Sequence, residues 1–297
     1  CRTLFDNITV TLSNTAAVGR LWVGKNGSRI VLARGAVLTA NPGYYGFLGT
    51  TSGGMEMREG SVLNIDRYFF LTGTRPDVTG TGTFLQSGGT VSSTGTLFLS
   101  GNNVLSCSST AQGVYTLAGG SLNLNVHSAQ SGISIGTGGG KFFFGKGTLN
   151  ANRVAIDLDN VNGGNLSPGG DEQVGETRLM PDAIGQQSAQ TAGRPFDEQR
   201  TYKQGAGSTW TVNIASRKDY DKVIWTGSGD KNRMVFENGA VIKIVPLKNF
   251  KPTTKANFDI ATADEIVLNG DLRLEGAAKG FSYECVDGKI LRLKYEP

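Results

Sequence analysis

Short runs of alternating apolar and polar residues, each led by a glycine, recur along the first half of the chain. Five such runs share a glycine, a small residue and a strand-like segment: Gly35-Ala-Val-Leu-Thr, Gly60-Ser-Val-Leu-Asn, Gly89-Thr-Val-Ser-Ser, Gly120-Ser-Leu-Asn-Leu and Gly147-Thr-Leu-Asn-Ala. Alternation places successive side chains on opposite faces of a β-strand. Glycine suits the turns because it tolerates positive φ. The pattern therefore predicts many short strands joined by glycine turns.

The spacing of these runs indicates one repeated unit. Their glycines are separated by 25, 29, 31 and 27 residues. The segment Gly82-Thr-Phe-Leu-Gln-Ser-Gly-Gly is echoed by Gly113-Val-Tyr-Thr-Leu-Ala-Gly-Gly, and more loosely by Gly140-Lys-Phe-Phe-Phe-Gly-Lys-Gly. One such unit cannot cover its own apolar face, whereas stacked units can. An antiparallel sandwich or barrel also has short strands and glycine turns, but the self-similarity favours a solenoid.

The solenoid hypothesis predicts which side chains lie inside. We expect Phe84, Tyr115, Leu122 and Leu149 in the core, because each stands on the apolar side of an alternating run. We expect the glycines that lead the last three runs, Gly89, Gly120 and Gly147, at equivalent corners of successive coils.

Two of these units resemble a known family. Gly82-Thr-Phe-Leu-Gln-Ser-Gly-Gly-Thr-Val and Ala111-Gln-Gly-Val-Tyr-Thr-Leu-Ala-Gly-Gly-Ser-Leu-Asn-Leu are similar to autotransporter-associated β-strand repeats. Residues 163–170, which contain Leu-Ser-Pro-Gly, resemble the element that follows such repeats. Residues 202–214 and 220–227 resemble the family's terminal coils. The resemblance extends from about residue 15 to about residue 262.

The resemblance implies a right-handed parallel β-helix, exported to the surface of a bacterial cell. Members are passenger-like autotransporter proteins or proteins with a PEP-CTERM-type sorting signal, and their roles are structural or adhesive. It implies no catalytic residues. The chain departs from the family pattern at residues 180–199, a polar insert that we expect to form a surface loop, either without a task of its own or as a contact arm to a neighbouring subunit.

The chain divides into four predicted parts. Residues 1–20 are a cap or exchange segment, and residues 21–179 form the repeat solenoid. The insert loop, 180–199, precedes the C-terminal coils and cap at residues 200–297. In that last part the period is lost, and the coils become irregular and more charged; a polar cap there would prevent open-ended stacking.

Composition favours an extracellular protein. Glycine supplies 43 of 297 residues, and only 18% of residues are charged. The net charge of +4 is spread along the chain, which excludes a localised basic surface for nucleic acid. No apolar run approaches 18 residues, so we expect no transmembrane helix. Because the chain starts at Cys1, we expect a mature form whose leader has been removed.

Candidate catalytic chemistry is sparse. Asp157 and Asp159 lie two residues apart, and paired carboxylates are what glycoside hydrolysis uses; turn capping is the favoured interpretation, because Asn and Gly follow them. A calcium loop of EF-hand type fails at Val161. The lone His127 and the cysteines Cys1, Cys107 and Cys285 lack metal-ligand spacing. We therefore expect no enzyme activity, cofactor or metal.

Aromatic clusters have two interpretations. Two clusters would stack on sugars if they were exposed: Tyr44, Tyr45 and Phe47, and residues 68–70 (Tyr-Phe-Phe). More often such clusters belong to a core or to the closing cap of a solenoid. We favour the core.

The ends of the solenoid are the predicted contacts between copies. A solenoid leaves backbone groups unpaired at its end coils, and another chain can pair with them. We expect the N-terminal segment of one copy to meet the C-terminal strands of the next, through Cys1, Phe5, Ile8, Val10, Leu12, Leu272, Leu274, Leu291, Leu293 and Tyr295. Cys1 would lock this contact as an intermolecular disulfide; alternatively it is a free thiol, or the lipidated first residue of a lipoprotein.

These observations predict a structural protein of the cell surface or extracellular space that self-associates into a fibre, layer or matrix. Its expected partners are other copies of itself, and surface polysaccharide is a further candidate. The alternative function is a carbohydrate-binding adhesin or a divergent polysaccharide-active β-helix enzyme.

Overall fold

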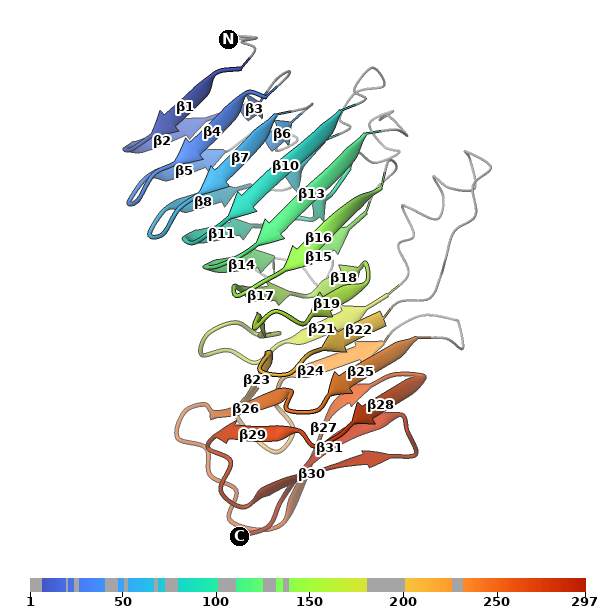
Figure 1. Cartoon of the computed structure of the whole chain (residues 1–297). Helices are drawn as coiled ribbons and strands as arrows, with labels where there is room; N and C mark the ends of the chain where they lie inside the picture. The colour runs from blue at the N-terminus through green and yellow to red at the C-terminus, as the bar shows by residue number, and fades with distance from the viewer. Residues whose placement is uncertain are drawn as a thin grey trace. The chain divides into compact units, whose positions relative to one another are not determined.

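The chain folds as a parallel β-helix, a stack of coils made of short strands (Figure 1). The residues that the structure describes contain no α-helix. This computed structural model describes residues 7–19, 21–23, 27–40, 48–50, 53–66, 69–72, 80–100, 111–124, 132–135, 139–180, 201–225 and 232–297, with backbone alone at 21–23 and 48–50. They form two compact units, which meet in sequence at Phe143 and Phe144. The predicted fold class is confirmed in both units.

Unit 1 contributes three strands to each coil. The first sheet consists of β1 (Thr9–Leu12), β4 (Arg29–Leu32), β7 (Gly54–Met57), β10 (Thr81–Gln86), β13 (Gln112–Leu117) and β16 (Gly140–Phe144). The second consists of β2 (Thr15–Val18), β5 (Val37–Ala40), β8 (Val62–Ile65), β11 (Thr90–Ser93) and β14 (Ser121–Leu124). The third side carries β3 (Leu21–Val23) paired with β6 (Leu48–Thr50), and then β9 (Phe69–Phe70), β12 (Leu97–Phe98) and β15 (Gly132–Ser134).

The core of unit 1 is built from columns of side chains in parallel register. One column aligns Met55, Phe84 and Tyr115, all at most 2% exposed. The rings of Phe84 and Tyr115 stack at 4.7 Å. A second column aligns Leu63, Val91 and Leu122, which have no exposed area. The in-register pairing repeats the same inward position in every coil, so the predicted burial of Phe84, Tyr115 and Leu122 is confirmed.

The corner glycines fall into two registers. Gly89 and Gly120 each stand directly before a strand, and the partners Thr90 and Ser121 align. Thr90 also aligns with Val62, so Gly89 lies opposite Ser61 and one position away from Gly60. The repeat seen in the sequence therefore shifts by one residue between the second and third of its glycines.

Unit 2 also has three sides. The first consists of β17 (Thr148–Ala151), β20 (Asn165–Leu166), β23 (Thr209–Ile214), β26 (Val241–Pro246) and β29 (Arg273–Gly276). The second consists of β18 (Arg153–Ala155), β21 (Glu176–Leu179), β24 (Lys222–Trp225), β27 (Ala256–Thr262), β31 (Ile290–Tyr295) and β30 (Phe281–Val286). The third consists of β19 (Leu158–Asn160), β22 (Thr201–Gln204), β25 (Arg233–Glu237) and β28 (Glu265–Asn269).

The core of unit 2 keeps a regular register where the sequence analysis expected the period to be lost. Leu149 and Leu166 align, and the same column continues to Trp210. The partners Thr209, Val241 and Arg273 follow at intervals of 32 residues. The first and third sides thus keep a constant interval after residue 200 although the glycine-led motif fades, whereas on the second side the partners Val223 and Ala261 are 38 residues apart and the last strands turn antiparallel. Leu149 has no exposed area, as predicted, and Gly147 directly precedes β17.

The last two strands form an antiparallel hairpin, which the glycine-led pattern did not predict. β31 pairs antiparallel with β27, with a bulge between Asp259 and Ala261, and β30 pairs antiparallel with β31. The turn at residues 287–289 contains two residues with positive φ, Asp287 and Gly288, which suits a tight hairpin connection. The chain thus ends its parallel stack with a strand pair that runs back over it (Figure 1, red).

The part of the chain that the structure describes contains no helix long and apolar enough to cross a membrane.

Candidate functional site

The predicted carboxylate pair, Asp157 and Asp159, is structural in its contacts. Asp157 Oδ1 accepts a hydrogen bond of 2.8 Å from the Thr201 backbone N–H, which follows 44 residues later in the chain. Asp159 aligns with Lys203 in the parallel register. Leu158 between them has no exposed area, so both carboxylates lie on the outer face. This arrangement agrees with capping, the favoured interpretation.

No metal centre forms among the described residues: they contain no group of three or more His, Cys, Asp and Glu side chains close enough to hold an ion. Cys1, Cys107 and His127 lie outside the described residues. Cys285 is a free thiol, half-buried, and its pKa is raised by burial. It is therefore poorly suited to nucleophilic chemistry.

The aromatic residues that are described lie mostly in the core. Phe69 and Phe70 have no exposed area, and Phe70 stacks on Phe98 at 4.9 Å between ring centroids. Tyr44, Tyr45, Phe47 and Tyr68 lie outside the described residues, so the other cluster stays a prediction. One aromatic ring on the surface escaped the sequence analysis: Phe143, on β16, is 51% exposed.

A buried tyrosine–glutamine pair recurs at one corner of each unit, and we call it the corner clamp. In unit 1, Tyr115 donates to Gln86 Oε1 at 2.6 Å. Gln86 Nε2 donates to the carbonyl oxygens of Gly89 at 3.2 Å and Ser121 at 2.9 Å. The amide therefore ties its own corner to the next coil.

In the corner clamp of unit 2 the glutamine makes the same kinds of contact, but the tyrosine comes from the same strand, β22, and not from the next coil. Tyr202 donates to Gln204 Oε1 at 2.9 Å, and Gln204 Nε2 donates to the carbonyl oxygens of Ser208 at 2.9 Å and Val241 at 2.8 Å. All four clamp side chains are buried. Burial raises the pKa of both tyrosines, which keeps them protonated as donors. Both clamps join coils and offer no reactive group to solvent.

Asp221 is a buried carboxyl group inside a hydrogen-bonded loop. Its Oδ1 accepts from Gly175 N–H at 2.7 Å, and its Oδ2 accepts from the backbone N–H and the side-chain Nδ2 of Asn213 at 2.9 Å. Asn213 Nδ2 also reaches the carbonyl oxygens of Gly170 and Gln173. Burial raises the pKa of Asp221 to about 7, although the three hydrogen bonds lower it. The network fixes the loop that follows β20.

Asp221 and its neighbour Asp219 differ in burial. In an extended strand, alternation would place the carboxylates on both sides of Tyr220 on the same face. Asp221 has no exposed area, whereas Asp219 is exposed and its carbonyl oxygen accepts from the Ala215 and Ser216 N–H groups of a turn. Alternation does not apply across a turn, so the two carboxylates are separated.

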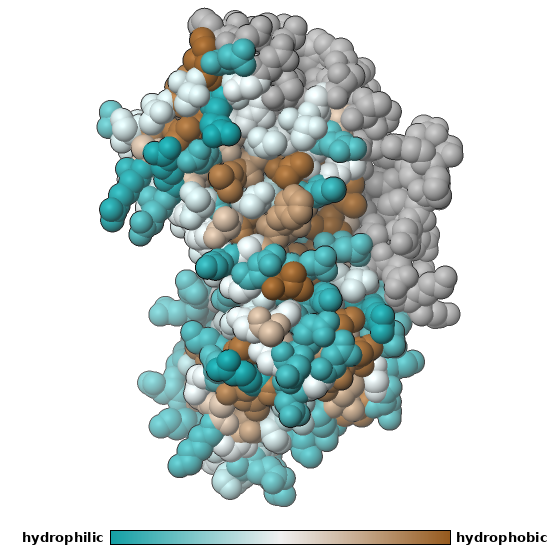
Figure 2. Space-filling model, in the orientation of Figure 1, coloured by the Kyte–Doolittle hydropathy of each residue, from teal (hydrophilic) through white to brown (hydrophobic). Residues whose placement is uncertain are grey.

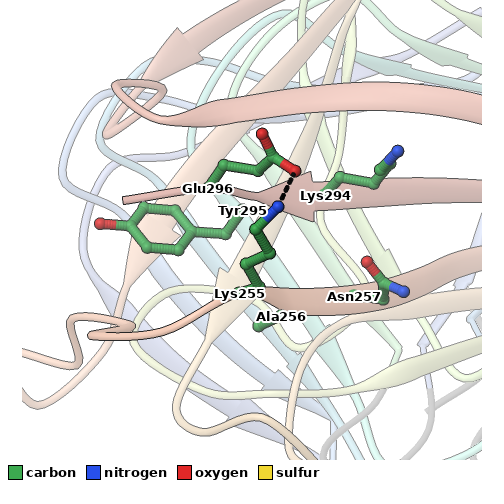
Figure 3. A pocket seen from close by; sticks show the side chains of 6 residues that line it. All are labelled: Lys255, Ala256, Asn257, Lys294, Tyr295 and Glu296. Carbon is green, nitrogen blue, oxygen red and sulfur yellow. Dashed lines mark hydrogen bonds and ion pairs between the residues drawn. The ribbon is translucent and has the colours of Figure 1, made fainter.

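A polar hollow of about 270 Å³ lies beside the paired strands β27 and β31 (Figure 3). It is lined by Lys255, Ala256, Asn257, Lys294, Tyr295 and Glu296. Lys255 Nζ and Glu296 Oε1 form an ion pair at 3.0 Å across it, and this contact lowers the pKa of Glu296. Both charges are exposed to solvent, so the hollow has the character of a solvated ion pair.

The N-terminal half of the predicted contact is exposed. β1 is the edge strand of its sheet, with β4 as its neighbour. Val10 aligns with the inward-facing Ile30, yet it is 53% exposed, and Ile8 beside the strand is 39% exposed. Leu12 is half-buried. Cys1 and Phe5 lie outside the described residues.

The C-terminal half of the predicted contact is largely buried. Leu291 and Leu293 have no exposed area and Leu272 is 6% exposed. Leu274 and Tyr295 are half-buried. The side chains of Leu291 and Leu293 point into the unit from β31, because that strand lies against β27 and completes the core. They are unavailable to a second copy as the chain is folded here.

Comparison with known proteins leaves the family open. No protein-family model matches the chain, and no curated protein matches it. The resemblance to autotransporter-associated repeats therefore stays a prediction.

Proposed function

We propose that the protein is a structural β-solenoid of the cell surface or extracellular space, which self-associates into a fibre, layer or matrix. The observation that carries this proposal is the open first coil. Its strands β1 and β2 are sheet edges whose inward-facing side chains are exposed or half-buried. Backbone N–H and C=O groups along such an edge pair readily with another strand.

Strands β1 and β2 carry none of the charges and prolines that protect many natural sheet edges. Residues 7–19 contain no charged residue and no proline. Charges, prolines and bulges are the usual means of blocking edge-to-edge pairing. Ile8-Thr-Val-Thr-Leu12 combines high β-propensity with zero charge, which is the composition of segments that assemble by strand pairing. Figure 2 shows brown and white atoms, with teal atoms among them, where β1 lies in Figure 1.

A positive charge placed on strand β1 tests the proposed self-association. Val10→Lys places an ammonium group at an inward-facing position of the open coil, where a pairing strand would have to desolvate it. We expect the parent protein to form larger particles as its concentration rises, measured by light scattering and electron microscopy, and Val10→Lys to remain monomeric.

Val161→Lys is the matched control, because Val161 is also an exposed valine, 38% accessible, but lies in unit 2. It should assemble like the parent. A parent protein that stays monomeric at high concentration would contradict the proposed function.

Phe143 favours carbohydrate binding as a second candidate function. Its ring is half exposed on the outer face of β16, next to the exposed Lys141. Exposed aromatic rings beside polar groups provide the apolar surface and hydrogen bonding that ligand sites combine. If this function holds, Phe143→Ala abolishes retention of the protein on insoluble polysaccharide, while Leu85→Ala, at an exposed apolar position on β10, leaves it unchanged.

A further inference from the structure

We propose that Asn269 is a site of spontaneous deamidation, a reaction that the fold permits at this corner and prevents at the matching corners of the preceding coils. Three Asn-Gly dipeptides lie in unit 2: Asn162-Gly163, Asn238-Gly239 and Asn269-Gly270. Asn-Gly is the dipeptide most prone to this reaction, because glycine has no side chain to hinder ring closure. The inference is independent of the proposed self-association.

The three dipeptides occupy the same kind of corner. Each follows a strand of the third side and precedes a strand of the first side: β19 and β20, β25 and β26, and β28 and β29 in turn. The corner between β22 and β23 carries Ala206-Gly207 instead. Because the corners are equivalent within the coil, a difference in reactivity has to come from what each glycine N–H contacts.

The nucleophile of deamidation is the backbone nitrogen of the glycine. It gives its proton to hydroxide and attacks Cγ of the preceding asparagine, which closes a succinimide ring. The Cγ–Nδ2 bond breaks, and Nδ2 takes a proton from water and leaves as ammonia. Water then opens the ring at either carbonyl carbon and yields aspartate or isoaspartate, with no oxidant or reductant involved. A hydrogen bond from the glycine N–H opposes the first step, because loss of the proton would leave the nitrogen facing an acceptor oxygen.

The following coil protects the earlier corners. Gly163 N–H donates to Ser208 Oγ at 3.0 Å, and Gly239 N–H donates to the Asp271 carbonyl oxygen at 2.8 Å. The same contact occurs at Gly207, whose N–H donates to the Gly239 carbonyl oxygen at 3.0 Å. In each case the acceptor belongs to the next coil, so the stacking of coils itself holds the glycine nitrogen in its unreactive form.

The corner at Gly270 lacks this protection. The terminal hairpin lies over the last coil and accepts from the N–H groups of Ile266 and Leu272, on either side of the corner. The N–H of Gly270 between them has no hydrogen-bond partner among the described residues. Asn269 and Gly270 are both exposed, so water and hydroxide reach the reacting atoms.

Deamidation at this position changes a contact between coils. Asn269 Nδ2 donates to Glu237 Oε2 at 3.1 Å, and Glu237 Oε1 pairs with Lys203 Nζ at 3.1 Å. These side chains come from three successive strands of the third side. A carboxylate at residue 269 replaces the donated hydrogen bond with repulsion between like charges. Isoaspartate also lengthens the backbone at the end of β28. The reaction therefore loosens the last coil as the protein ages.

Peptide mass spectrometry of the folded protein tests this site. The parent is incubated at mildly alkaline pH, and the fraction of each Asn-Gly peptide that has gained the amide-to-acid mass increase is followed over time. We expect the Asn269 peptide to convert several-fold faster than those of Asn162 and Asn238, and all three to convert at similar rates in denaturant. Asn269→Gln is the matched control: it keeps the amide but would have to close a larger ring, so its peptide should stay unmodified.

Ser208→Ala tests whether the hydrogen bond is what protects. It removes the buried hydroxyl that accepts from Gly163 N–H. Conversion at Asn162 should then become several-fold faster, while conversion at Asn238, whose glycine donates to a backbone carbonyl, stays as in the parent. Conversion at Asn162 or Asn238 as fast as at Asn269 in the folded parent overturns the proposal, and so does an unmodified Asn269. An unchanged rate at Asn162 in a folded Ser208→Ala protein overturns the protection by the next coil.

Discussion

At the scale of single residues, two glycines with the same backbone conformation have different reasons to be glycine. Gly35 and Gly120 have φ of 77° and 72°, a region that other residues enter at a cost. A Cβ on Gly35 would meet no atom within 4 Å, whereas one on Gly120 would lie 2.1 Å from the carbonyl oxygen of Gly89 in the preceding coil. Only Gly120 is also required by close approach between coils.

This difference predicts unequal effects of alanine. Gly35→Ala should cost about 1–2 kcal/mol, the penalty of a left-handed conformation. Gly120→Ala also displaces a packed backbone, which should lower the free energy of unfolding by about a further 1–3 kcal/mol. Urea unfolding followed by circular dichroism measures both. Equal losses in the two variants would show that the coils separate easily at this corner.

Asp221 predicts a pH dependence of stability. Its pKa is about 7 in the folded protein, raised mainly by burial, against a usual value of 3.8. Between these two values the folded state holds a proton that the unfolded state has released. The free energy of unfolding therefore falls as the pH rises from about 4 to about 7, by at most about 4 kcal/mol for a shift of this size.

Asp221→Asn isolates this contribution. The variant loses overall stability, because its amide donates towards Asn213 N–H and Nδ2 where the carboxyl oxygen accepted. The informative quantity is the slope of the unfolding free energy between pH 4 and 7, which should become flatter than in the parent. Identical slopes would mean that Asp221 is ionised throughout this range.

At the scale of elements, alternation predicted the strands of unit 1 because each inward position repeats in register. Phe84, Tyr115 and Leu122 lie where a period of two puts them. The hairpin of β30 and β31 was missed, because an antiparallel strand has the same alternation as a parallel one. Pairing direction is a property of the partner strand, and a single segment does not encode it.

The corner clamps were missed for a related reason. Gln86 and Gln204 look like solvent-exposed polar residues at strand ends, and glutamine is usually exposed. Their burial depends on carbonyl oxygens of Ser121 and Val241, 35 and 37 residues away in the chain. The available signal was a tyrosine close to a glutamine at a corner, in strands of successive coils for Gln86 and Tyr115 and in one strand for Tyr202 and Gln204.

The clamps predict a graded loss of stability. Gln204→Leu leaves the carbonyl oxygens of Ser208 and Val241 and the Tyr202 hydroxyl without this amide, so it should cost about 3 kcal/mol or more. Tyr202→Phe removes one hydrogen bond and should cost about 1 kcal/mol. Thermal and urea unfolding give both values. Gln86→Leu should match Gln204→Leu, and a much smaller effect would mean that the two clamps are not equivalent.

At the scale of the whole molecule, the first and last described coils differ in charge. The described strands β1 and β2 of the first coil are uncharged, while the last coil is charged and two of its backbone N–H groups, those of Ile266 and Leu272, donate to the hairpin. Figure 2 shows hydrophilic colours over much of the surface around the last strands. Repeat proteins need terminal caps because each repeat is completed by its neighbours. An edge strand such as β1 is therefore a candidate place for contact with another copy.

This asymmetry predicts that removing the hairpin changes how the protein assembles. Deletion of residues 278–297 removes Leu291 and Leu293 from the core and uncovers Phe258, which has no exposed area in the intact chain. It also frees the N–H groups of Ile266 and Leu272. The freed N–H groups can then pair with another copy. Electron microscopy and light scattering should show larger particles than the parent forms at the same concentration. Tyr283→Phe, which removes the hydroxyl that accepts from Leu272, tests the same cap without deleting a strand, and should increase exchange of the Leu272 amide hydrogen. A truncated protein that remains folded and forms particles no larger than those of the parent would show that the hairpin does not limit assembly at this end.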